Sequence, residues 1–63
     1  MKKGVVKFFN DEKGFGFITD DESGQDFFVH VTGVNGEIAD GDKVEFDVEE
    51  GRKGLMAVNV TRV

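Results

Sequence analysis

The chain has 63 residues, eight basic and thirteen acidic side chains, and a formal net charge of −5. This length predicts one small domain, residues 1–63, in which leucine, isoleucine, valine and phenylalanine make up about a third of the chain, enough for a core. The absence of cysteine excludes disulfides and thiolate metal sites, and one histidine cannot build a zinc site, so we expect neither metal nor cofactor. No apolar run approaches the roughly 18 residues of a membrane span, and the amino terminus lacks the apolar stretch of a signal peptide. We therefore expect a cytoplasmic monomer that does not contact membranes.

Closely spaced glycines divide the chain into segments too short for helices, and no segment shows a sustained 3.6-residue apolar period. Five runs instead predict strands, at about residues 3–9, 13–20, 26–31, 43–50 and 55–62. So many short strands expose vulnerable edges unless the sheet closes, and the economical closure is the five-stranded OB-fold barrel. The sequence thus predicts an all-β, antiparallel OB-fold, in which oligonucleotides lie on the face of the second and third strands.

The second and third predicted strands carry four of the seven phenylalanines and the only histidine. Side chains alternate between the two faces of a strand, so Phe15 and Phe17 share one face, as do Phe28 and His30. We predict that these rings are exposed, and that Gly14 and Gly16 leave the surface between them clear for a flat ligand. Exposed rings interleaved with basic residues are what stacking of single-stranded nucleic acid requires.

The opposite face of the same strands predicts the core. Ile18 alternates with Phe15 and Phe17 and is expected inside, and Phe27 and Phe46 share parity with the valines of their strands. These two phenylalanines are therefore expected to pack in the interior.

Charge is distributed unevenly along the chain. Residues 1–18 carry four lysines and two carboxylates, whereas residues 19–63 carry four basic and eleven acidic groups. The basic first part is compatible with phosphate binding, which lysine and arginine drive by releasing counterions. We interpret the acidic groups at residues 20–22 and 45–50 as solvated charges that face away from the rings.

Three motifs, Gly4–Asn10, Lys13–Ile18 and Asp26–His30, resemble the opening strand and the two RNP motifs of bacterial cold-shock proteins. The resemblance extends over essentially the whole chain. It implies a cold-shock domain that binds single-stranded RNA and DNA and acts as an RNA chaperone or antiterminator in a stress response, without catalysis.

The same resemblance implies which residues bind. The base-stacking positions are Phe8, Phe15, Phe17, Phe28 and His30; the basic positions are Lys7, Lys13 and Lys53; and the positions that contact base edges are Asn10 and Asp26. For Asn10 and Asp26, formation of the adjacent turns is an equal alternative, because both residue types bond local backbone.

Four features depart from the family pattern. Phe8 stands where tryptophan is usual, Val31 where an aromatic residue is common, and Leu55 where proline is usual. Residues 33–42 form a shorter loop than the family's, without its aromatic residue. We expect weaker stacking at Phe8 and a truncated far end of the ring surface.

Two other functions compete with nucleic-acid binding. An exposed phenylalanine patch would also suit a protein-interaction module, and the net negative charge of the chain favours this interpretation slightly. An enzyme is the third hypothesis, but a chain with no cysteine, no tyrosine and one histidine offers no convincing catalytic constellation. We therefore expect a binding protein and not an enzyme.

Overall fold

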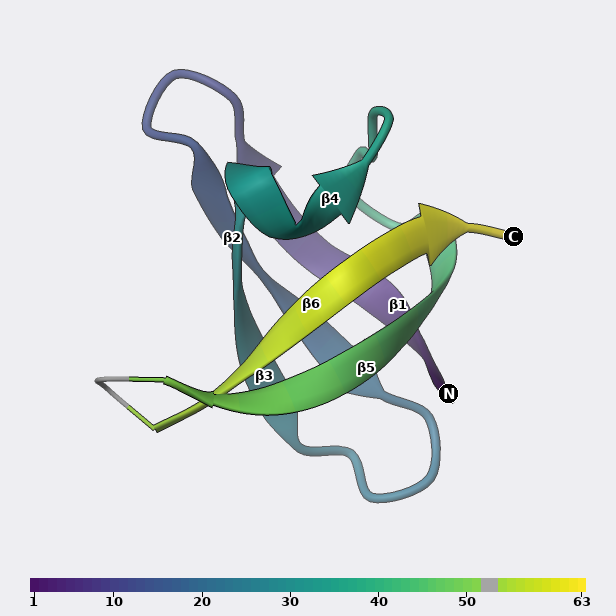
Figure 1. Ribbon diagram of the computed structural model, residues 1–63. Helices are drawn as coiled ribbons and strands as arrows, with labels where there is room; N and C mark the ends of the chain where they lie inside the picture. The colour runs from purple at the N-terminus through teal and green to yellow at the C-terminus, as the bar shows by residue number, and fades with distance from the viewer. Residues whose placement is uncertain (52–53) are drawn as a thin grey trace.

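The computed structural model describes residues 1–51 and 54–63, and in these residues the chain forms six strands and one 3-10 helix (Figure 1). The strands are β1 (Lys2–Asn10), β2 (Phe15–Asp20), β3 (Asp26–His30), β4 (Val34–Asn35), β5 (Lys43–Gly51) and β6 (Gly54–Arg62). The 3-10 helix, η1, spans Val31–Gly33. All five predicted strands are present, and η1 and the two-residue β4 are additions to them. Within the described part of the chain η1 is the whole helical content, so nothing helical there has the length to cross a membrane.

The five long strands close into a barrel. Antiparallel pairs join β1 to β2, β2 to β3, β1 to β5 and β5 to β6. A parallel pair between β3 and β6, with Phe28 opposite Met56, completes the ring. In Figure 1, β5 and β6 cross in front of the layer that β1, β2 and β3 form. The predicted five-stranded OB barrel is thus confirmed, but it is not wholly antiparallel: strands that alternate in direction cannot close a ring of odd number without one parallel seam.

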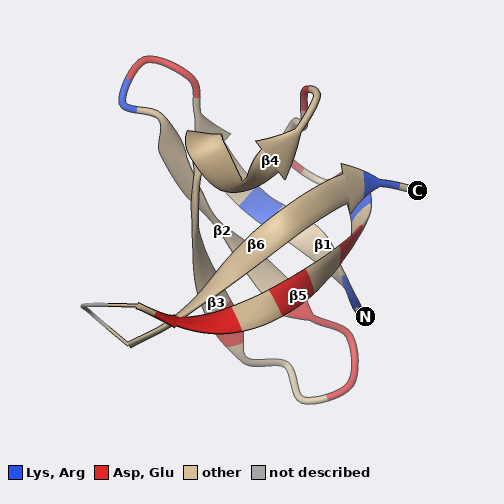
Figure 2. Cartoon of the chain, in the orientation of Figure 1, with Lys and Arg blue, Asp and Glu red and all other residues tan. Residues whose placement is uncertain are grey.

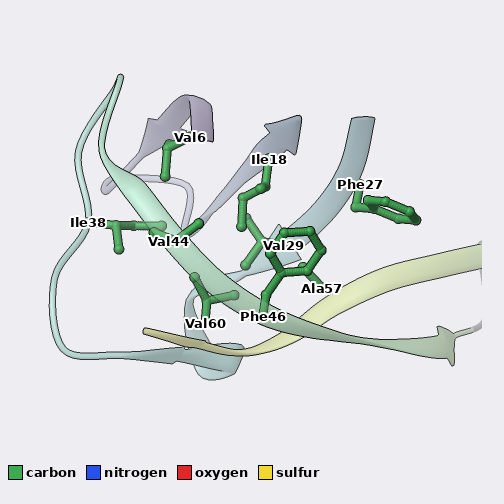
Figure 3. Packing of buried hydrophobic residues seen from close by; sticks show 9 residues of the cluster. All are labelled: Val6, Ile18, Phe27, Val29, Ile38, Val44, Phe46, Ala57 and Val60. Carbon is green, nitrogen blue, oxygen red and sulfur yellow. The ribbon is translucent and has the colours of Figure 1, made fainter. Parts of the chain in front are cut away.

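The interior of the barrel is filled by nine buried apolar side chains (Figure 3). They are Val6, Ile18, Phe27, Val29, Ile38, Val44, Phe46, Ala57 and Val60. The rings of Phe27 and Phe46 contact one another at a centroid distance of 5.8 Å. Ile18, Phe27 and Phe46 are therefore core residues, as strand alternation predicts.

One of the acidic groups expected in solvent is buried. The Asp20 side chain is 2% exposed at the end of β2 and accepts hydrogen bonds from Ser23 Oγ at 2.9 Å and from the Glu22 backbone N–H at 3.3 Å. The Ser23 bond, helped by the Glu22 N–H and by Lys2 at 3.7 Å, holds the pKa of Asp20 below its ordinary value. Asp20 stabilises the turn between β2 and β3, so the interpretation of Asp20 as a solvated charge was wrong.

The loop after β4 closes the edge of β1. Pairing of β1 with β5 extends only to Val5, and beyond it Val6 donates to the Asp42 carbonyl at 2.9 Å and accepts from the Gly41 N–H at 2.7 Å. The Phe9 N–H donates to the Asp40 carboxylate at 2.9 Å. The short loop thus satisfies backbone hydrogen bonds at the edge of β1 that would otherwise be left open.

Candidate nucleic-acid interface

A β-bulge in β1 brings the first ring to the outer surface. The register between β1 and β2 shifts between Val6, which lies opposite Ile18, and Phe8, which lies opposite Phe17. Strict alternation from the buried Val6 would turn Phe8 inward, but the extra residue, Lys7, restores the outward direction. Lys7 and Phe8 are both exposed as a result.

Four phenylalanines from three neighbouring strands then meet on this surface, and we call them the aromatic platform: Phe8, Phe15, Phe17 and Phe28. Phe17 lies opposite Phe8 on one side and Phe28 on the other, with ring centroids 5.5 and 5.9 Å away. Phe15 and Phe28 are stacked at 5.9 Å with an interplanar angle of 21°. Phe8 is 37% exposed, and the other three rings are partly shielded by one another. The rings lie on the outer face, as predicted, and form one continuous apolar surface.

The glycine between the rings has a different role from the one predicted. Gly16 points into the barrel wall, where a β-carbon would collide with the Phe8 carbonyl and lie 2.7 Å from the Phe9 Cα. Gly16 therefore permits close packing of β1 on β2 and does not clear space for a ligand. Gly14 has a φ of +74° and ends the turn before β2, which is why β2 begins at Phe15 and not at residue 13.

One edge of the platform carries an ion pair. Lys7 Nζ donates to Asp26 Oδ2 at 3.0 Å, across β2, and Thr19 Oγ1 donates to Asp26 Oδ1 at 2.7 Å. The Thr19 and Lys7 hydrogen bonds together hold the pKa of Asp26 below its ordinary value. The structure thus brings two of the predicted site residues, Lys7 and Asp26, into direct contact.

The turn between β1 and β2 involves two more of them. The Asn10 side-chain oxygen accepts the Lys13 N–H at 3.1 Å, and the Asn10 carbonyl accepts the Gly14 N–H at 2.8 Å. Asn10 therefore stabilises the turn, the second of its two predicted roles, and Lys13 is exposed within it. Lys53 lies outside the described residues.

His30 stands at the other edge, opposite Phe15. It is the last residue of β3 and the N-cap of η1, where its side chain accepts the Thr32 N–H. The ring is exposed at the surface.

Four acidic residues lie on a strand outside the platform. Glu45, Asp47, Glu49 and Glu50 belong to β5, which is not one of the platform strands and runs across the front of Figure 2 as a largely red ribbon. The platform strands β1 and β2 meet β5 only at the end of β1 that Lys2–Val5 forms. Although the chain has a net negative charge, these four carboxylates therefore do not lie among the rings.

Sequence reasoning missed three neighbours of the platform: Thr19, which bonds Asp26; Thr32, which bonds His30; and Met56, which extends the surface beyond Phe28. Thr19 shares parity with Phe15 and Phe17, and that signal would have placed it on the same face. Met56 lies next to the platform because β6 pairs in parallel with β3, and no local sequence pattern predicts that pairing. Val31 and Leu55, two of the departures from the family pattern, are 46% and 50% exposed.

The platform and its flanking cations define a surface suited to flat aromatic ligands that carry negative charge, which describes nucleotides. A family model for the 'Cold-shock' DNA-binding domain matches residues 2–63. The chain is 54% identical over 61 residues to cold shock-like protein CspG of Shewanella violacea, an alignment that covers 90% of this chain and 87% of that protein. It is 48% identical over 65 residues to cold shock-like protein CspC of Escherichia coli, covering 97% and 94% of the two chains.

Similarity extends beyond bacteria. Glycine-rich protein 2 of Nicotiana sylvestris is 53% identical over 64 residues, which cover 94% of this chain and 30% of that protein. A solved structure of drosophila Unr CSD456 superposes with a TM-score of 0.80 at 29% identity, covering 98% of this chain and 26% of that one. The chain therefore belongs to the cold-shock domain family, whose members bind nucleic acids.

Proposed function

We propose that this protein binds single-stranded RNA and DNA by stacking bases on the aromatic platform, with low sequence specificity, and thereby keeps RNA unfolded as a chaperone or antiterminator. The observation that carries the proposal is the row of four phenylalanine rings, 5.5 to 6.5 Å apart, on the outside of the barrel. Every base offers a face for such rings, so stacking tolerates any sequence.

The residues around the platform are assigned roles by their position. His30 adds a fifth ring at the edge, Lys7 and Lys13 supply positive charge for the phosphates, and Lys53 is assigned with them on family resemblance. Asp26 pairs with Lys7, and Asn10 shapes the turn that presents Lys13. None of these roles needs a bond to be broken, so we propose binding without catalysis, by a monomer in the cytoplasm.

Titration with short homopolymers of each base, single-stranded and duplex, tests the proposal. A duplex hides the base faces, so it should bind far more weakly than the single strand. Phe17→Ala should weaken single-strand binding by about 1–3 kcal/mol and leave the circular dichroism spectrum close to that of the parent. Equal affinity for duplex and single strand would instead indicate phosphate contacts alone.

The same experiment separates the alternative of a protein-interaction module. Such a module would retain a protein from cell extract at low salt and would release no oligonucleotide. Retention of nucleic acid, lost in Phe17→Ala, supports the stacking function.

A further inference from the structure

Thr32 contacts the chain's only histidine, His30, at one particular ring atom. The Thr32 backbone N–H donates to His30 Nδ1 at 3.3 Å, and Thr32 Oγ1 lies 3.0 Å from the same nitrogen. Both contacts arise because η1 starts directly after β3, with His30 as its N-cap, so the turn brings Thr32 to the edge of the imidazole that carries Nδ1.

The contact with the Thr32 backbone N–H selects one tautomer of the ring. A backbone N–H can only donate, so Nδ1 must be unprotonated to accept it, and a neutral imidazole then carries its proton on Nε2. In this form the Thr32 hydroxyl also donates to Nδ1. In the opposite tautomer the Nδ1 proton would face the backbone N–H, and only the bond to the hydroxyl would remain.

We propose that Thr32 is a positioning residue for His30: it holds the ring in the Nε2–H tautomer and in a fixed plane, so that a hydrogen-bond donor stands beside Phe15 at the edge of the platform. The inference rests on the proposed function, since the partner of that donor is an acceptor on the edge of a base stacked on the rings. His30 thus adds polar recognition to a surface otherwise made of phenylalanine.

The free protein gives a test that needs no ligand. His30 is the only histidine, so its ring nitrogen shifts in an NMR experiment on ¹⁵N-labelled protein in alkaline buffer are assigned without ambiguity. We expect a larger Nε2–H fraction in the folded protein than in the same chain unfolded in urea. Thr32→Ser and Thr32→Val both keep the backbone N–H of residue 32, so both should keep that fraction. The same fraction in the folded parent and in the unfolded chain would overturn the inference.

Binding to a single-stranded uridine homopolymer, whose bases carry carbonyl acceptors, gives the second test. Thr32→Val should weaken binding by about two- to tenfold, the value of one hydrogen bond, and Thr32→Ser should bind like the parent. In a His30→Phe background, which keeps a ring but has no nitrogen, Thr32→Val should have no further effect. An equal loss in both backgrounds would mean that Thr32 acts independently of His30 and would overturn the proposal.

The two tests separate this inference from the proposed function. If the parent binds no single-stranded nucleic acid, the proposed function fails whatever the NMR result. If the parent binds but its Nε2–H fraction is the same in the folded and the unfolded chain, only the positioning role fails. Thermal unfolding of each variant checks that Thr32→Val remains folded at the temperature of the measurement.

Discussion

Replacing Asp26 by asparagine tests how much charge contributes to binding. Lys7 and Asp26 lie 3.0 Å apart with side chains 59% and 39% exposed, so Lys7 is partly neutralised before any phosphate arrives. Asparagine keeps an oxygen for the Thr19 hydroxyl but removes the negative charge. Lys7 is then free to neutralise one phosphate more completely, and binding should become tighter at low salt and more sensitive to salt.

The expected salt dependence follows from the number of cations that contact phosphates. If the proposed cations Lys7, Lys13 and Lys53 contact the bound strand, with Lys3 and Arg52 as further candidates, about two to four phosphates are neutralised, which gives a log–log salt slope of about −1.5 to −3 for the parent. One further phosphate in Asp26→Asn should make the slope steeper by about 0.7. A parent slope steeper than about −5 would contradict this small set of lysines.

Homopolymer titrations between about 50 and 200 mM salt measure both slopes. Asp21→Asn is the matched control, because it removes the same charge from an exposed position in the β2–β3 turn, and its slope should stay near that of the parent. If Asp26→Asn bound more weakly with an unchanged slope, Asp26 would be a direct contact to a base edge, and the reasoning about Lys7 would be refuted.

In β2 and β3, strand alternation was enough to separate the side chains of the core from those of the platform. Ile18 is fully buried while Phe15 and Phe17, three residues and one residue before it, lie outside, because a strand has a fixed period of two. The same rule placed Phe27 inside and Phe28 outside. Burial on one face of a closed barrel leaves no other register for these strands.

Features that depend on distant contacts could not be predicted in this way. The bulge at Lys7 breaks the alternation, so Phe8 reached the platform in the sequence analysis only through family resemblance. The role of Gly16 depends on how closely β1 approaches β2. The burial of Asp20, by contrast, follows from a local bond to Ser23, a pattern that the sequence does display.

Three further predictions concern stability and the edge of the platform. Phe46→Ala should lower the free energy of unfolding by about 3–5 kcal/mol in urea titrations, whereas Phe15→Ala, at the surface, should cost much less; equal losses would contradict the assignment of core and platform. Asp20→Asn should lower the melting temperature at pH 7, and the difference from the parent should shrink as the pH falls below about 4. The reason is that the fold lowers the pKa of Asp20, so the ionised carboxylate stabilises the fold above the ordinary pKa of 3.8, and this stabilisation is lost when Asp20 is protonated. Val31→Phe restores a ring where 46% of the valine is exposed, next to His30, and one more base can stack there. Binding of longer homopolymers should tighten by up to about 1–3 kcal/mol, with little change for the shortest ones. Val63→Phe, an exposed valine outside the platform strands, controls for added hydrophobic surface, and the same gain in both variants would mean that position 31 is not part of the binding surface.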